Sequence, residues 1–172
     1  MTQKTVFTYL ISLFVYIVMQ TALLNKMVIS NFAFCFFYVG FLIYMPFNIS
    51  RITLLILGFL VGLVIDVFGD TIGIHMIACT TLMFVKPFWQ QTTLGDMREL
   101  TGFISMKGVS IIRLMVYTIP LLLLHHALVF LLDSIGAGFQ LDIVLRVLFS
   151  AIFTFFVLVI IQLFSTKTTK RI

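Results

Sequence analysis

Charge is the first thing that this sequence has little of. Lysine, arginine, aspartate and glutamate make up 10% of the 172 residues, against about 25% in an average soluble domain. With 62% hydrophobic residues and a mean hydropathy of +1.21, this shortage excludes both a water-soluble globule and a disordered chain. The solvent expected around most of the protein is therefore lipid.

Cysteine, proline and recognisable catalytic motifs are also scarce. Cys35 and Cys79 lie in separate apolar runs, unlike the disulfide framework of a secreted domain, and we interpret them as small core residues. Three prolines and ten glycines exclude a collagen-like or linker-rich chain. The sequence has no Gly-x-Ser-x-Gly, no His-Glu-x-x-His and no Walker loop, so we expect neither an enzyme nor a cofactor.

What the sequence does contain is six apolar stretches, each close to the roughly 20 residues that a helix needs to cross a bilayer. They lack an alternation of period two and exceed the roughly 10 residues of a membrane strand. We therefore predict an all-α membrane protein with six transmembrane helices in one domain. The predicted spans are 6–24, 27–45, 52–68, 72–89, 109–132 and 143–165. The connection 90–108 has apolar residues at helical spacing and predicts a short amphipathic helix at the membrane surface.

The basic residues indicate how these spans are oriented. They form no stripe of the kind that binds nucleic acid, despite a net charge of +5. With six spans, all but Lys26 and Arg146 of the 11 lysines and arginines fall on the side that both termini share. Because positive loops stay inside, both termini and the 90–108 loop are predicted to be cytoplasmic. Lys86 and Arg113 lie near cytoplasmic ends, where we expect their side chains to reach the membrane surface.

Polar side chains gather in one layer of the predicted membrane, in its outer half. The residues of this layer are Asp66, His75, His125, His126 and Arg146. Such residues are costly in lipid and usually face protein. They could form a structural network between helices, a docking surface for another membrane helix, or a metal or proton site. A metal site is the weakest of these, because adjacent histidines on a helix diverge by about 100°.

Two stripes of residues spaced by four predict a helix contact. The stripes are Gly58, Gly62 and Asp66 in the third span and Arg146, Ser150 and Thr154 in the sixth. Glycines at this spacing allow the close backbone approach that drives helix association in lipid. We therefore expect these two spans to pack antiparallel, with Asp66 facing Arg146. The alternative is that Arg146 pairs with Asp142 at the lipid surface.

The segment from Leu57 to His75, LGFLVGLVIDVFGDTIGIH, resembles the MreD family of rod-shape-determining membrane proteins. The family has a Gly-x-x-x-Gly-Leu-x-x-Asp core followed by a short turn and Gly-x-His. The matching residues are Gly58, Gly62, Leu63, Asp66, Gly73 and His75. The Bacteroidota-type version adds three features that are found here as Pro46-Phe47-Asn48, His125-His126 and Arg146. The resemblance covers most of the chain.

The resemblance implies a non-enzymatic scaffold of the cell-wall elongation machinery in the bacterial inner membrane. Its expected partner is an MreC-like single-span protein, and through it MreB filaments, a glycosyltransferase and a class B penicillin-binding protein. The implied fold is similar to that of the six-helix substrate-binding subunits of energy-coupling-factor transporters. A vitamin-type binding subunit of such a transporter is the alternative function. The outer loops, which are very short apart from the ten residues 133–142, disfavour it, because a lidded pocket needs longer ones.

Overall fold

The computed structural model describes residues 3–24, 27–29, 32–46, 48–95, 104, 109–135 and 141–164. Of these, 81% are helical. The elements are α1 (Gln3–Val18), the π-helical turn η1 (Met19–Leu23), β1 (Val28–Ile29), β2 (Ala33–Phe34), α2 (Val39–Tyr44), α3 (Arg51–Gly69), α4 (Ile74–Leu94), α5 (Ile111–Asp133) and α6 (Leu141–Phe164). The first five residues of the connection 90–108 extend α4, and most of the predicted amphipathic helix, residues 96–103 and 105–108, lies outside the described residues.

Four described helical segments are long and apolar enough to cross a membrane, as expected of an integral membrane protein. They are Val6–Leu23, Arg51–Gly69, Ile111–Asp133 and Asp142–Leu163. The fourth predicted span corresponds to α4, which has 21 residues but a more polar sequence that includes Lys86 and two glutamines. Serines begin two of the long helices, because the hydroxyls of Ser50 and Ser110 accept hydrogen bonds from the first turns of α3 and α5.

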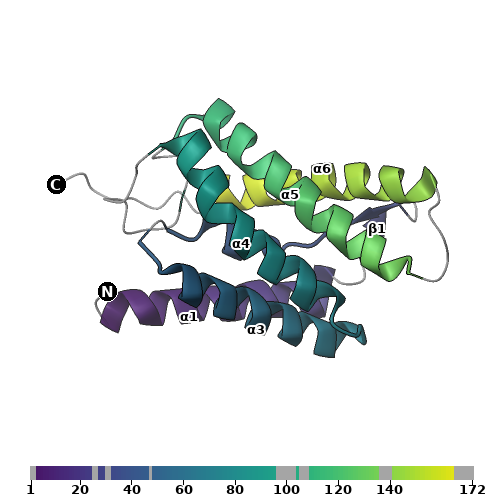
Figure 1. The fold of residues 1–172 in the computed structure, drawn as a ribbon, viewed down its shortest axis with the longest axis horizontal. Coiled ribbons are helices and arrows are strands. Elements are labelled where there is room, and N and C mark those ends of the chain that lie inside the picture. The colour runs from purple at the N-terminus through teal and green to yellow at the C-terminus, as the bar shows by residue number, and fades with distance from the viewer. Residues whose placement is uncertain are drawn as a thin grey trace.

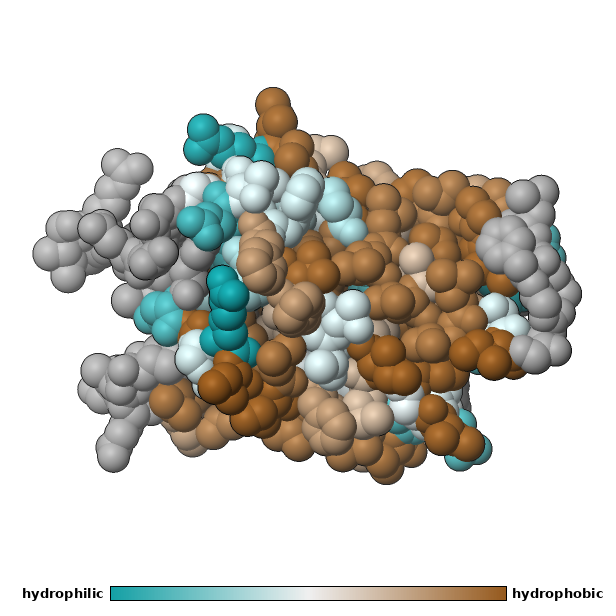
Figure 2. Space-filling view, viewed as in Figure 1, coloured by the Kyte–Doolittle hydropathy of each residue, from teal (hydrophilic) through white to brown (hydrophobic). Residues whose placement is uncertain are grey.

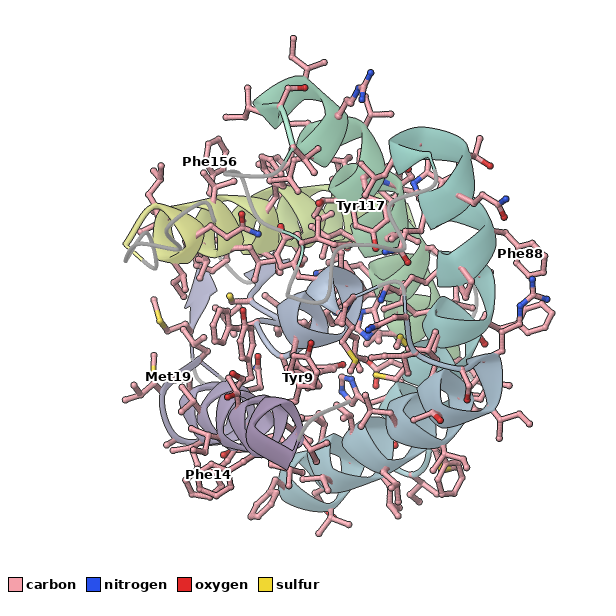
Figure 3. The ribbon with its side chains drawn as sticks, turned by 90° about the vertical axis from the view of Figure 1, so that its left-hand side faces the viewer. Tyr9, Phe14, Met19, Phe88, Tyr117 and Phe156 are labelled. Atoms are coloured by element: carbon pink, nitrogen blue, oxygen red, sulfur yellow. The ribbon has the colours of Figure 1, made fainter. Side chains whose placement is uncertain are left out.

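The long helices form a ring in which consecutive helices are neighbours (Figures 1 and 3). α3 packs along α4, α4 along α5 and α5 along α6, and each runs antiparallel to the one before. α1 begins and α6 ends at the same end of the ring, at the left of Figure 1. We call this the basic end, because Arg51 and Arg113 lie there. The opposite end, with Asp70, Asp133 and Asp142, is the acidic end.

The prediction of a continuous helix over 27–45 is wrong. This segment does pass from the acidic end to the basic end (Figure 1), but it begins as the antiparallel hairpin of β1 and β2. It continues without regular structure to the six-residue helix α2, which lies inside the ring (Figure 3). Every residue of α2 is buried. An apolar run shows that a segment avoids water, but it does not distinguish a helix from an extended chain enclosed by protein.

Polar side chains from two neighbouring helices make this non-helical segment possible inside the ring. The hydroxyls of Ser150 and Thr154 on α6 accept hydrogen bonds from the backbone N–H groups of Phe34 (2.9 Å) and Phe36 (3.1 Å). On the other side, the Gln20 amide in η1 donates to the Cys35 carbonyl at 2.9 Å. Irregular backbone is tolerated at membrane depth only where the protein satisfies its hydrogen bonds.

The exterior of the ring is apolar. Figure 2 shows hydrophobic residues over most of one face, with most of the hydrophilic ones toward the basic end. The aromatic rings of Phe14, Phe88 and Phe156 point outward and are more than half or about half exposed, whereas Tyr117 points inward and is fully buried (Figure 3). In lipid this exposure has no cost, since acyl chains take the place of a protein core.

Candidate functional site

The candidate site is built around the hydroxyl of Tyr38, which lies just before α2 in the centre of the ring. Its oxygen is 2.7 Å from Nδ1 of His75 on α4 and 2.9 Å from Nε2 of His125 on α5. A phenol has one proton, so it donates to one imidazole and accepts an N–H from the other. Tyr38 and His125 are fully buried and His75 is 8% exposed. The three side chains thus tie residues 35–45, which we call the central segment, to two helices.

His125 is incompletely satisfied in this arrangement. Its Nδ1 atom is buried and has no hydrogen-bond partner. If Tyr38 donates to Nε2, the neutral ring carries an unpaired N–H at Nδ1; in the other arrangement Nδ1 is an unpaired acceptor. Buried N–H groups are orphaned less often than acceptors, so we assign the tautomer in which His125 donates from Nε2 and Tyr38 donates to His75.

His126 is held by different partners, and its tautomer follows from them. Its Nδ1 lies 2.7 Å from the carbonyl oxygen of Leu122, which can only accept, so Nδ1 carries a proton. In the neutral ring Nε2 then accepts from the hydroxyl of Thr154 on α6, at 3.1 Å. Because Thr154 also binds the backbone of Phe36, His126 links α5, α6 and the central segment.

The ring of Phe36 lies among the three imidazoles. Its centroid is 5.4 Å from that of His75, 5.9 Å from that of His125 and 5.1 Å from that of His126. The structure therefore brings together three of the five residues that the sequence places in one layer. We call His75, His125, His126 and Tyr38 the histidine cluster.

Asp66 lies beside this cluster but binds backbone. Its two carboxylate oxygens accept hydrogen bonds from the N–H groups of His75 (3.0 Å) and Met76 (2.9 Å), and Thr71 donates its hydroxyl to one of them. These N–H groups open the first turn of α4, where a negative charge also meets the positive end of the helix dipole. Asp66 therefore stabilises the start of α4.

The predicted packing of the third span on the sixth is not formed, nor is the contact between Asp66 and Arg146. Gly58 and Gly62 face α4 instead, where added Cβ atoms would meet the backbone of Cys79 and Met76. Arg146 does not join the histidine cluster, and its Nε is buried without a partner. In the ring, α4 and α5 lie between α3 and α6, and the carboxylate of Asp66 binds the start of α4 instead.

The prediction that the Lys86 side chain reaches the membrane surface is also wrong. It is fully buried, and its ammonium donates to the Met45 carbonyl at 2.8 Å. The two preceding carbonyls accept from the Ile104 N–H (to Tyr44, 2.8 Å) and from the Tyr117 hydroxyl (to Ile43, 2.6 Å). The end of a helix leaves such carbonyls unpaired and attracts a cation. Lys86 therefore caps α2.

Sequence analysis also missed Tyr38 and Gln20. Both lie inside apolar runs, and a single polar group in a predicted span is the signal that could have indicated a buried partner.

The side chains of the histidine cluster form hydrogen bonds within the protein, and their burial leaves none of them accessible as a nucleophile or a base. The thiol of Cys79 adds only long contacts, 3.9 Å to the Tyr38 oxygen and 3.8 Å to Nε2 of His125. Within the described part of the chain, no three His, Cys, Asp or Glu side chains are grouped so that they could hold a metal ion.

Compared with protein-family models, with curated proteins and with solved structures, the chain matches none of them.

Proposed function

We propose that this chain is a non-enzymatic scaffold of the MreD type in the bacterial inner membrane. In this proposal the chain crosses the membrane six times, with the central segment as the second crossing, in a fold like that of the substrate-binding subunits of energy-coupling-factor transporters. It binds an MreC-like single-span protein and, through it, the enzymes and filaments of cell-wall elongation.

The observation that carries the proposal is that the protein's own chain fills the centre of the ring. A substrate-binding subunit needs a cavity toward which polar groups converge. Here Tyr38, His75 and His125 converge on one another, and α2, every residue of which is buried, lies inside the ring. The polar groups of the interior are used to hold the helices together, which favours a scaffold over a transporter subunit.

The arrangement of helix ends supports a testable topology. Thr92, near the end of α4, belongs to the basic end, and Ser134, just after α5, belongs to the acidic end. With the basic end in the cytoplasm, a cysteine at 134 should react with an impermeant thiol reagent in intact spheroplasts, and a cysteine at 92 should not. The native Cys35 and Cys79 are buried, so the parent chain supplies a low background. Labelling at 92 but not at 134 would overturn the orientation.

The partner can be tested directly. Short outer loops leave little surface outside the membrane, so docking must use helix faces. We expect a full-length MreC-like protein from the same genome to remain bound to this chain through purification in mild detergent. Its soluble outer domain, expressed without the span, should bind at least tenfold more weakly.

Two results would count against these expectations. If the soluble outer domain bound as tightly as the full-length partner, docking through helices would be excluded. Absence of the full-length partner, together with a vitamin-sized molecule retained in native mass spectrometry, would favour the transporter subunit.

A further inference from the structure

Among the residues that the structure describes, Arg146 is a charged side chain with a buried nitrogen atom that has no hydrogen-bond partner. It lies in the second turn of α6, on the same side of the helix as Ser150 and Thr154. Those two residues hold the backbone of β2 and Phe36, so this side of α6 faces the hairpin and the central segment. Arg146 continues the stripe toward the acidic end, where it is partly exposed.

No described carboxylate neutralises this guanidinium. Asp66 is occupied by the start of α4. The remaining described acids, Asp70, Asp133 and Asp142, are exposed at the acidic end, and none of the three forms an ion pair with Arg146. The alternative pairing with Asp142 is therefore not formed either. Nε of Arg146 is a buried donor with no acceptor.

The surroundings of Arg146 make this unpaired charge costly. Leu145 and Phe149 on α6 are exposed apolar side chains, and so are Val28 and Ile29 of β1, which pairs with β2, the strand that packs on α6. An arginine within the membrane is costly unless it finds a partner, and such residues usually face protein. A carboxylate can satisfy Nε–H and a second N–H together, in the bidentate geometry that arginine favours.

We infer that Arg146 binds a carboxylate on the membrane-spanning helix of the partner, near the outer end of that helix. The helix would lie against α6 and β1, covering their exposed apolar side chains. This inference rests on the proposed scaffold function and adds the residue and the chemistry of recognition. A lipid phosphate is the competing ligand. It is disfavoured because Arg146 lies one helical turn, about 6 Å, deeper along α6 than the exposed Asp142.

The experiment measures how much full-length MreC-like partner co-purifies with variants of this chain. Arg146→Met keeps the apolar stem and removes the charge, and we expect at least a tenfold loss of bound partner. Arg146→Lys keeps the charge without the bidentate geometry and should retain an intermediate amount. Arg113→Met, which removes an exposed arginine at the basic end, is the matched control and should bind like the parent chain.

Crosslinking keeps the test independent of how well the Arg146 variants fold. A photoreactive amino acid at the exposed position Leu145 should crosslink to the partner's span. The same group at Ile112, exposed at the basic end of α5, should not. Replacing the partner's outer-end acid by arginine should restore binding to Arg146→Glu, because the swap re-forms the pair with reversed charges.

The outcomes separate the inference from the proposed function. If the parent chain retains no partner, the scaffold function itself fails. Partner bound equally by the parent chain and Arg146→Met, with no crosslink at 145, overturns only the inference. A normal amount of partner with loss of a retained anionic phospholipid from Arg146→Met, seen by native mass spectrometry, would assign the site to lipid phosphate instead.

Discussion

Replacing Asp66 with asparagine is expected to destabilise the protein by about 3 kcal/mol, the scale of a lost charge-assisted hydrogen bond plus a poorly satisfied buried donor. Both carboxylate oxygens are needed, since one accepts from the His75 N–H and the other from the Met76 N–H. An amide offers one acceptor, and its NH₂ group would face the second backbone N–H. The measurement is thermal or detergent-induced unfolding of the purified protein in one fixed detergent.

Asp70 supplies the matched control for this substitution. It lies four residues further on, is exposed, and has a left-handed backbone with φ 54°. Asparagine is one of the few residues that adopts this conformation readily. Asp70→Asn should therefore unfold within about 0.5 kcal/mol of the parent chain. If the two asparagine variants unfold alike, the hydrogen bonds of Asp66 to α4 contribute nothing to stability.

Most of the long helices could be predicted from the sequence because their apolar runs are bounded by local signals. Ser50 and Pro46 separate α2 from α3, and the observed Arg51–Gly69 differs by one residue at each end from the predicted 52–68. The helix content of 27–45 could not be predicted in the same way. Its hydropathy is that of a span, but its conformation depends on Gln20, Ser150 and Thr154, which are distant in sequence.

The candidate site, too, could be predicted only in part from the sequence. The depth of a residue in an antiparallel ring follows from its distance to the ends of its helix, so the sequence could place His75, His125 and His126 in one layer. Which helices are neighbours does not follow from depth. α3 lies beside α4 because a short turn connects them, and the acceptors of Asp66 meet donors within ten residues of the chain. Asp66 therefore binds a partner that is close in sequence, although its depth alone would also allow a distant one.

The second large effect is expected at a glycine of α3 whose added Cβ would meet the backbone of α4. Gly62→Ala should prevent the two helices from packing, because the added Cβ would overlap the backbone Cα of Met76 and lie 2.5 Å from the carbonyl oxygen of His75. Overpacking usually costs about 1–3 kcal/mol when side chains can move aside. Here the obstacles are backbone atoms of a helix, so we expect a loss of 3 kcal/mol or more, as an order of magnitude. The same contact positions His75, so the substitution also displaces the histidine cluster.

Gly69→Ala, near the end of the same helix, is the control for this substitution. Its added Cβ would meet only the hydroxyl of Thr71, at an ordinary 3.6 Å. Alanine has a helix propensity about 1 kcal/mol more favourable than glycine. Gly69→Ala should therefore unfold at the parent temperature or above it, whereas Gly62→Ala should unfold far below it or fail to accumulate in membranes. Gly58→Ala should behave like Gly62→Ala, because its Cβ would lie 2.8 Å from the Cys79 carbonyl oxygen. If Gly62→Ala and Gly69→Ala were equally stable, α3 would have to pack on α4 with more space than the structure allows, and the glycine stripe would have to face another helix.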